Sequence, residues 1–187
     1  IVLDPYSYTT KKPNDNGWLW TLGKTQYDWL KSTLETSNAK YKFVFIHQLV
    51  GGDNQGRGGV ELAKFYEWGG YNLDGTYGFD NERSGWGKPI HQLLVDNGVN
   101  VVFKGHDHFY SKQELDGVIY QTLPQPSHPG DKLNTTQEYG YTTGTTIGGS
   151  GYLNVNIMTD SAKIDFVGTQ TIGDRTSKVL DSYTIFN

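Results

Sequence analysis

The sequence predicts an α/β protein in which a mixed sheet with flanking helices leads into a mostly antiparallel C-terminal β portion. Residues 1–123 alternate short apolar runs with segments whose apolar positions recur at the helical period, a pattern typical of β-α-β units. Because 187 residues suffice for one core, we interpret 1–187 as a single unit with an α/β part (1–123), a loop (124–150) and closing strands (151–187). The later strands are expected at Val118–Leu123, Tyr152–Met158, Lys163–Thr169 and Val179–Ile185.

The first expected elements are a short strand and an amphipathic helix. The strand is the apolar run Ile1 to Asp4, which a polar turn region follows. Thr25 and Asp28 have the spacing of a capping box, so we expect the helix to begin there and to continue to about Thr36. Its apolar side is expected to consist of Tyr27, Leu30 and Leu34.

Two apolar strands come next, and each leads directly to histidine. Tyr41–Ile46 is nearly continuous in apolar and aromatic residues, which indicates a strand that is buried on both faces and that ends at His47. A helix that begins after Pro89 separates it from the strand Val99–Phe103. That strand runs into Gly105-His106-Asp107-His108, whose glycine permits close backbone approach or an unusual φ at the strand exit.

The segment 51–87 is rich in glycine and aromatic residues and shows little periodicity, apart from a short helix expected within 60–68. Its aromatic content argues for order, because disordered linkers contain few aromatic residues. Long loops in compact domains are commonly functional. We therefore expect an ordered lid over a site.

The composition excludes several classes of function. The chain has no cysteine, which rules out a disulfide framework, a cysteine zinc site, an iron–sulfur cluster and a thiol nucleophile. With 16 Lys and Arg against 20 Asp and Glu, a net charge of −4 and no basic run, we expect no nucleic acid as a general partner. No apolar stretch approaches the ~18 residues that a membrane span needs. Low basic content without cysteine suits an extracytoplasmic or secreted protein.

Three histidines are predicted to meet at one edge of the sheet. His47 and the pair His106 and His108 follow two strands that a helical crossover joins, which makes these strands parallel and brings their carboxyl ends together. In extended chain the imidazoles of His106 and His108 lie on the same side, roughly 6–7 Å apart. This spacing suits ligands of two metal ions about 3.5–4 Å apart. The alternative interpretation is a hydrogen-bonded histidine pair in a loop.

Two further residues are candidate substrate contacts. Arg57 lies in a glycine-rich loop, where a guanidinium and backbone amides converge on an anion such as phosphate. His128 lies in a proline-rich loop that is suited to line a pocket. A solvated surface position is the alternative for both. His91 lies next to the apolar face of its helix, so we expect it at the flank or in solvent and not on a metal.

Two of these blocks resemble those of a known family. Val44-Phe45-Ile46-His47 and Gly105-His106-Asp107-His108 are similar to the V-x-x-H and G-H-x-H blocks of the calcineurin-like metallophosphoesterases, which include the purple acid phosphatases. The resemblance covers residues 1 to about 123. It implies part of a four-layer α-β-β-α sandwich with a dinuclear centre of Fe, Mn or Zn, in which His47 and His106 bind one ion and His108 the other. It also implies hydrolysis of phosphoric esters by metal-activated water.

The family's upstream blocks D-x-H, G-D-x-x-D and G-N-H-D/E are not found in the sequence. We therefore expect this chain, whose first residue is Ile1 and not Met, to be a piece of a longer protein, namely the C-terminal half of a metallophosphoesterase domain. Two cations also need carboxylate ligands. The chain alone is expected to bind at most one metal weakly, to be inactive on phosphate esters, and to expose an apolar sheet face to the missing N-terminal half or to a second copy.

Two other functions remain open from the sequence. The glycine, tyrosine, tryptophan, asparagine and threonine content suits a non-catalytic cell-surface domain that binds carbohydrate or protein. A mononuclear hydrolytic zinc site with three histidine ligands is the other.

Overall fold

The computed structural model describes residues 1–7, 9, 16–51, 56–127, 133–169 and 175–186. The described strands form two sheets. The larger has six strands in the order β1-β2-β3-β5-β4-β6, and the smaller has three in the order β7-β8-β9. The strands are β1 (Val2–Leu3), β2 (Phe43–Ile46), β3 (Val101–Lys104), β4 (Tyr110–Leu115), β5 (Val118–Thr122), β6 (Thr145–Ile147), β7 (Gly151–Ile157), β8 (Ser161–Gly168) and β9 (Val179–Phe186).

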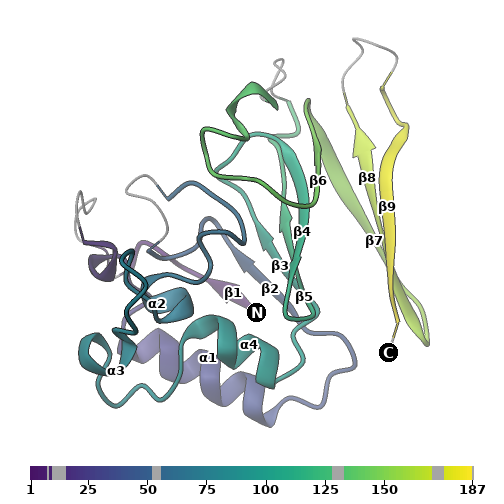
Figure 1. Ribbon diagram of the computed structural model, residues 1–187. Helices are drawn as coiled ribbons and strands as arrows, with labels where there is room; N and C mark the ends of the chain where they lie inside the picture. Colours follow the sequence, from purple (N-terminus) through teal and green to yellow (C-terminus); the bar gives the residue numbers. More distant parts are fainter. Residues whose placement is uncertain (8, 10–15, 52–55, 128–132, 170–174, 187) are drawn as a thin grey trace.

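Helices cover one face of the larger sheet, and the smaller sheet covers part of the other (Figure 1). The helices are α1 (Lys24–Thr36), α2 (Tyr66–Gly69), α3 (Phe79–Glu82) and α4 (Ile90–Asp96), with 3-10 turns η1 (Gly17–Leu19) and η2 (Leu133–Thr135). The main core lies between α1, α4 and the strands β1, β2, β3 and β5. Between the sheets, the rings of Tyr110 and Phe166 stack with centroids 4.4 Å apart. The predicted α/β class with an antiparallel C-terminal portion is confirmed.

Strands β1, β2, β3 and β5 run parallel. Helical crossovers connect β1 to β2 and β2 to β3, whereas the chain reaches β5 from β3 through β4. Strand β4 pairs antiparallel with both β5 and β6. The register pairs Ile46 of β2 with Lys104 of β3. The chain therefore leaves both strands at the same edge, with His47 next to Gly105. The predicted meeting of the two strand ends is confirmed.

The predicted start of the first helix was wrong. Helix α1 begins at Lys24 after Gly23, whose φ of 74° lies in the left-handed region that glycine tolerates. Thr25 is already inside the helix, and the carboxylate of Asp28 pairs with the Lys24 ammonium instead of capping the end. The predicted apolar side is confirmed, since Tyr27, Leu30 and Leu34 are all buried.

Strands β4 and β6 were not predicted from the sequence. Strand β4 has the sequence YSKQEL, which has no apolar alternation, and β6 falls in the segment that we expected to be loop. The buried amide of Gln113 is tolerated in β4 because it has partners. This amide donates to the carboxylate of Glu61 at 2.9 and 3.0 Å.

The strand that precedes His47 is not buried on both faces, as its composition had suggested. Phe45 is 44% exposed because the two sheets separate on the β1 side. A pocket of about 610 Å³ lies there, with Val2, Phe45 and Phe103 of the larger sheet on one wall and Leu153 and Val155 of β7 on the other. An apolar groove between the sheets thus remains open to solvent.

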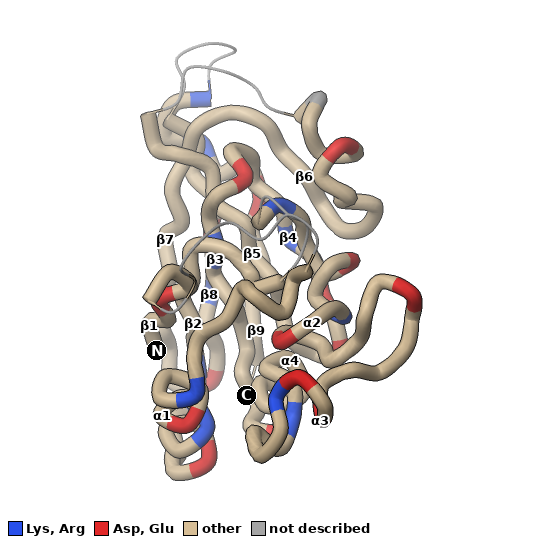
Figure 2. Tube along the Cα trace, turned by 90° about the vertical axis from the view of Figure 1, so that its left-hand side faces the viewer, with Lys and Arg blue, Asp and Glu red and all other residues tan. Residues whose placement is uncertain are grey.

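Charged side chains of both signs are interspersed along α1, and no continuous basic stripe runs over the described chain (Figure 2). This distribution agrees with the net charge of −4. Within the part of the chain that the structure describes, no helix combines the length and the apolar character that crossing a bilayer requires.

Candidate metal centre

The imidazoles of His47 and His106 meet at the carboxyl edge of β2 and β3. Nε2 of His47 lies 3.0 Å from Nδ1 of His106, and the rings stand edge to face with centroids 5.0 Å apart. The backbone N–H of Gly105 donates to the carbonyl of His47 at 3.0 Å, which ties the two strand exits together. The two imidazole nitrogens therefore lie side by side because of the register between β2 and β3 and this backbone hydrogen bond.

His108 lines the same pocket as His47 and His106. The pocket thus combines the three histidines at one end with the apolar groove between the sheets, and Leu123 and Pro124 contribute to its wall. Its shape gives a ligand access to the imidazoles from the open side of the groove.

The unusual backbone conformation at the strand exit belongs to His106 and not to Gly105. His106 has a φ of 68°, in the left-handed region that a residue with a Cβ rarely adopts. A Cβ on Gly105 would meet nothing closer than 3.8 Å. The expected need for glycine at position 105 is therefore not supported by the described packing, whereas the loop does hold His106 in an uncommon conformation.

Asp107 points away from the pocket into the protein and is fully buried. Its carboxylate accepts hydrogen bonds from the Tyr141 hydroxyl at 2.7 Å, the Gly58 amide at 3.1 Å and the Arg57 guanidinium at 3.1 Å. The Lys104 ammonium lies 3.5 Å away. The two neighbours of this carboxylate in the sequence, His106 and His108, are partly exposed and line the pocket.

The electrostatic environment keeps His47 in the neutral form that binds metal. Burial lowers the pKa of His47 below its ordinary value, and the nearby charges of His106, Lys104 and Arg57 lower this pKa further, whereas Asp107 opposes them. A metal ligand must be the unprotonated imidazole. The environment of His47 thus favours ligation over protonation.

The pKa of Tyr141, which contacts Asp107 behind the histidine loop, is shifted upward, in the opposite direction to that of His47. Burial and the Asp107 carboxylate raise the pKa of Tyr141, so its hydroxyl stays a donor to Asp107. Burial lowers the pKa of Lys104, and Asp107 opposes this shift. The ammonium of Lys104 donates in turn to the Tyr141 oxygen at 2.7 Å.

The chemistry of the donor set fits the imidazole part of a metal centre but not a complete one. Two nitrogens 3.0 Å apart have roughly the separation of neighbouring ligands that each lie ~2.0–2.1 Å from one zinc ion. Among the described residues, however, no three His, Asp or Glu side chains are grouped closely enough to enclose an ion. The carboxylate that the loop itself contains, that of Asp107, is turned inward and engaged by Arg57 and Tyr141.

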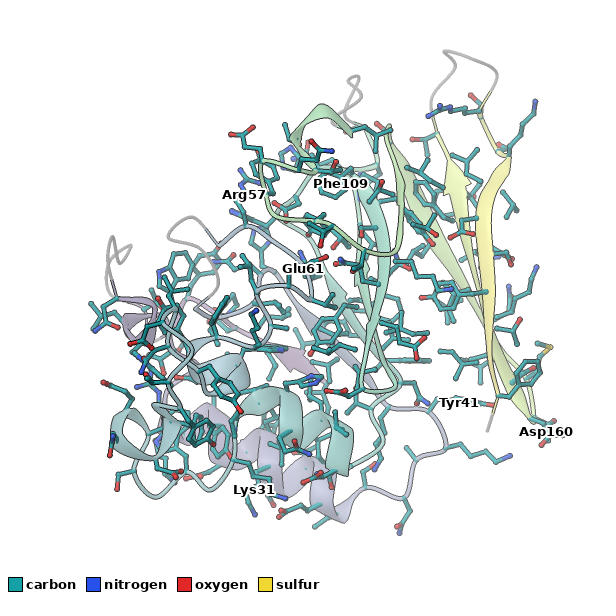
Figure 3. The ribbon with its side chains drawn as sticks, in the orientation of Figure 1. Lys31, Tyr41, Arg57, Glu61, Phe109 and Asp160 are labelled. Carbon is teal, nitrogen blue, oxygen red and sulfur yellow. The ribbon has the colours of Figure 1, made fainter. Side chains whose placement is uncertain are left out.

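Arg57 reaches the histidine loop from behind. Its Nη1 donates to the carbonyl of His106 at 2.6 Å and to the carboxylate of Asp107 at 3.1 Å, and the guanidinium lies 4.7 Å from the ring centroid of Tyr139. Figure 3 shows Arg57 and Phe109 at the same end of the molecule, far from Lys31 on α1. A substrate contact by Arg57 stays a prediction, and His128 lies outside the described residues.

The aromatic segment does not form the expected lid. None of the described residues of 56–87 lines the histidine pocket. Instead Tyr66 and Phe79 pack against Trp18, and the buried carboxylate of Glu67 pairs with Arg83 at 2.6 Å. Part of the aromatic segment thus forms a small core with Trp18, whereas Trp68 belongs to the main core and Tyr71 and Tyr77 are exposed.

His91 is buried and not a solvent-facing flank residue. Its Nδ1 lies 2.8 Å from the hydroxyl of Tyr120, and its Nε2 lies 3.0 Å from the carboxylate of Asp116. The indole of Trp68 donates to the same Tyr120 hydroxyl at 2.8 Å. His91 thus belongs to a polar chain with Tyr120 and Trp68. It does not line the histidine pocket, in agreement with the expectation that it is not a metal ligand.

Sequence reasoning missed the residues that support the histidine loop. Asp107 is inside the recognised tetrapeptide, but nothing in the pattern indicates that it points inward. Tyr141 lies in a segment expected to be loop, so its contact with Asp107 could not be read from periodicity. The one available signal was the position of a carboxylate between two histidines.

Comparisons with known proteins were made by sequence and by structure. Neither a protein-family model nor a curated protein sequence matches this chain. Several solved structures are similar in fold, and three of them illustrate the likeness. GAP50, the anchor in the inner membrane complex of Plasmodium, has a TM-score of 0.55 and 13% identity, and the match covers 100% of this chain and 48% of that one.

The other two are PhoD and a purple acid phosphatase. The structure of PhoD has a TM-score of 0.60 and 17% identity, with 99% of this chain and 39% of that chain covered. The purple acid phosphatase PPD1 from seeds of yellow lupin (Lupinus luteus) has a TM-score of 0.52 and 15% identity, with 89% and 29% covered. The chain thus spans less than half the length of each of these proteins, and at these identities the likeness is one of fold.

Proposed function

We propose that this chain, which has a calcineurin-like metallophosphoesterase-type fold, is the C-terminal half of a domain that hydrolyses phosphoric esters with the help of metal ions. The observation that carries the proposal is the contact between His47 and His106, two imidazoles held 3.0 Å apart at the carboxyl edge of parallel strands. Ligand sites of α/β sheets form at this edge. His108, in the same pocket, is the third ligand that we propose.

In this proposal, His47 and His106 bind one ion and His108 binds the other. When bound, such ions supply Lewis acidity and an activated water, with iron, manganese and zinc as the candidates. The chain's own contribution is to hold the three imidazoles at the mouth of the groove, where the lowered pKa of His47 favours its neutral form. Arg57 and His128 are proposed as contacts of the phosphate ester, and no protein nucleophile is needed.

The chain alone is expected to be inactive on phosphate esters, because it lacks upstream carboxylate ligand blocks. We would assay hydrolysis of p-nitrophenyl phosphate and bis(p-nitrophenyl) phosphate with Mn²⁺, Zn²⁺ or Fe³⁺. The matched sample is a longer chain that includes the upstream coding sequence, with His47→Ala as control. The proposal is supported if the longer chain hydrolyses these esters and the substitution His47→Ala abolishes the activity. Enzyme-like turnover by residues 1–187 alone contradicts the predicted division of the site.

The proposed partner of this half is the upstream half, and its proposed location is the open groove. Val2, Phe45 and Val155 are exposed apolar residues on facing walls of this groove. In isolation, the same face could associate with a second copy. Sedimentation of the chain with and without the separately produced upstream half distinguishes the cases. A monomer that does not bind the upstream half counts against both partners.

A second candidate is a non-catalytic binding domain that retains the fold. It is favoured by the absence of a complete donor group among the described residues, and one fold neighbour is described as an anchor in a membrane complex. Carbohydrate or protein would then be the ligand, and a cell-surface or secreted location would suit either candidate. A longer chain that lacks metal and activity would favour this function. Activity of the short chain with one zinc per chain would favour a three-histidine zinc site.

A further inference from the structure

We propose that Asp107 is a positioning residue, whose buried carboxylate holds the loop 105–108 so that His106 faces His47. Its importance for metal binding rests on the proposed function, whereas its effect on the distance between the two imidazoles does not. Asp107 is fully buried, whereas its two neighbours in sequence, His106 and His108, line the pocket.

The first step is the number of donors that the carboxylate engages. It receives one hydroxyl, one backbone amide and one guanidinium within 3.1 Å, from Tyr141, Gly58 and Arg57. These donors come from different parts of the chain, and Tyr141 is itself linked to Lys104 of β3 and to Thr122 of β5. The carboxylate is therefore fixed relative to the larger sheet, and the backbone of the loop is fixed with it.

The second step is the backbone of the loop. The amide of Asp107 donates to the carbonyl of Gly105 at 2.9 Å, a tight turn around His106, whose φ is 68°. A non-glycine residue keeps such a conformation only where its surroundings impose it. The bonds to the side chain of Asp107, the last residue of this turn, supply the constraint.

The third step is the double contact of Arg57. One nitrogen of its guanidinium donates both to the Asp107 carboxylate and to the His106 carbonyl, at 3.1 and 2.6 Å. Because that carbonyl belongs to the turn, Arg57 restrains the peptide unit that orients His106. Gly58 allows this close approach, since its φ is 104° and a Cβ there would meet the Leu62 side chain at 2.3 Å.

The test compares two variants of this network with a matched control. Asp107→Asn keeps the shape of the side chain but removes its charge, and Tyr141→Phe removes one hydroxyl donor. Tyr110→Phe is the control, because Tyr110 follows His108 by two residues at the start of β4 but donates to a carboxylate outside the loop network, that of Asp181 on β9 at 2.6 Å, and neither residue lines the histidine pocket. All are made in the chain 1–187 and compared by melting temperature.

The metal-free readout is the contact between the imidazoles, measured by NMR as the nuclear Overhauser effect between the His47 and His106 rings and by crystallography as the nitrogen–nitrogen distance. The second readout is the affinity for Co²⁺ alone. We expect Asp107→Asn and Tyr141→Phe to lose the imidazole contact and to weaken Co²⁺ binding by roughly 10- to 100-fold, as for other residues that orient ligands. Tyr110→Phe should change neither.

The proposal is overturned if both Asp107→Asn and Tyr141→Phe keep the imidazole contact. It is also overturned if Tyr110→Phe, at a melting temperature equal to theirs, loses the contact to the same extent. If Asp107→Asn does not fold, Tyr141→Phe decides on the same readouts. If the unmodified chain and the longer chain both bind no Co²⁺, the proposed function fails. The imidazole contact in the variants still decides whether Asp107 positions the loop.

Discussion

The protein contains two buried carboxylate–arginine pairs of similar construction in different surroundings. Asp107 pairs with Arg57 behind the histidine loop, and Glu67 pairs with Arg83 in the aromatic segment. In each pair the arginine also donates to a backbone carbonyl, and the carboxylate also accepts a backbone amide. The difference is what lies beside them. Two pocket-lining histidines flank the first carboxylate in sequence, whereas Tyr66 and Trp68, which do not line that pocket, flank the second.

A buried ion pair is therefore not by itself a sign of a functional site. Burial raises the pKa of Glu67, and Arg83 opposes that shift. This buried pair lies in a region whose described residues line none of the histidine pocket. What separates the two pairs is the backbone that each one constrains.

The largest effect on folding is expected from Arg83→Ala. Removing Arg83 leaves the buried carboxylate of Glu67 with the Leu22 amide and the Thr21 hydroxyl, and it deletes contacts of the guanidinium with the rings of Trp18 and Trp86. Breaking a buried pair from one side costs about 3–5 kcal/mol. Urea unfolding should show a loss of this size. At urea concentrations below the unfolding midpoint, the Co²⁺ affinity of Arg83→Ala should stay within about twofold of that of the unmodified protein. The reason is that the Glu67–Arg83 pair and the histidine loop share no contacts among the described residues.

A smaller loss of stability, but a larger loss of Co²⁺ affinity, is expected from Arg57→Ala. Asp107 keeps three other donors, Tyr141, Gly58 and Lys104, so the unfolding free energy should fall by only about 1–3 kcal/mol. Binding of Co²⁺, measured by calorimetry, should weaken about tenfold or more as the His106 carbonyl is released. Arg57→Lys should recover only part of the Co²⁺ affinity, because one ammonium does not reproduce the hydrogen bonds of a planar guanidinium.

The two arginine variants together decide whether the two buried pairs have different roles. If Arg83→Ala weakens Co²⁺ binding as much as Arg57→Ala does, the effect follows overall stability and not the histidine loop. If Arg57→Ala changes stability alone, the two pairs are equivalent and both are structural.

The sequence predicted the His47–His106 contact because only local patterns are needed for it. Each histidine follows an apolar run, and the crossover rule aligns the ends of the two strands. The supports of the loop depend on pairs far apart in the chain. Asp107 meets Tyr141 over 34 residues and Arg57 over 50, through loops without periodicity. The exposure of Phe45 was likewise unpredictable, because composition does not indicate where two sheets separate.

The smallest effect concerns Glu61, a carboxylate held without arginine. Burial raises the pKa of Glu61, but hydrogen bonds from Thr142, Gln113 and Thr143 outweigh it and leave this pKa below its usual value. A lowered carboxylate pKa stabilises the folded state above the unfolded pKa of 4.5, and this contribution is lost as the pH falls below it. Glu61 is partly exposed, so the contribution should be at most ~1 kcal/mol.

The pH dependence of unfolding should therefore be shallower in Glu61→Gln than in the unmodified protein between about pH 5 and 3. Asp28→Asn is the matched control, because Asp28 pairs with Lys24 on exposed α1 and such pairs contribute only ~0.3–0.5 kcal/mol. Equal acid sensitivity of Glu61→Gln and the unmodified protein would show that neutral donors do not hold this carboxylate. The distinction between a carboxylate bound by arginine and one bound by hydroxyls and amides would then rest on Asp107 and Glu67 alone.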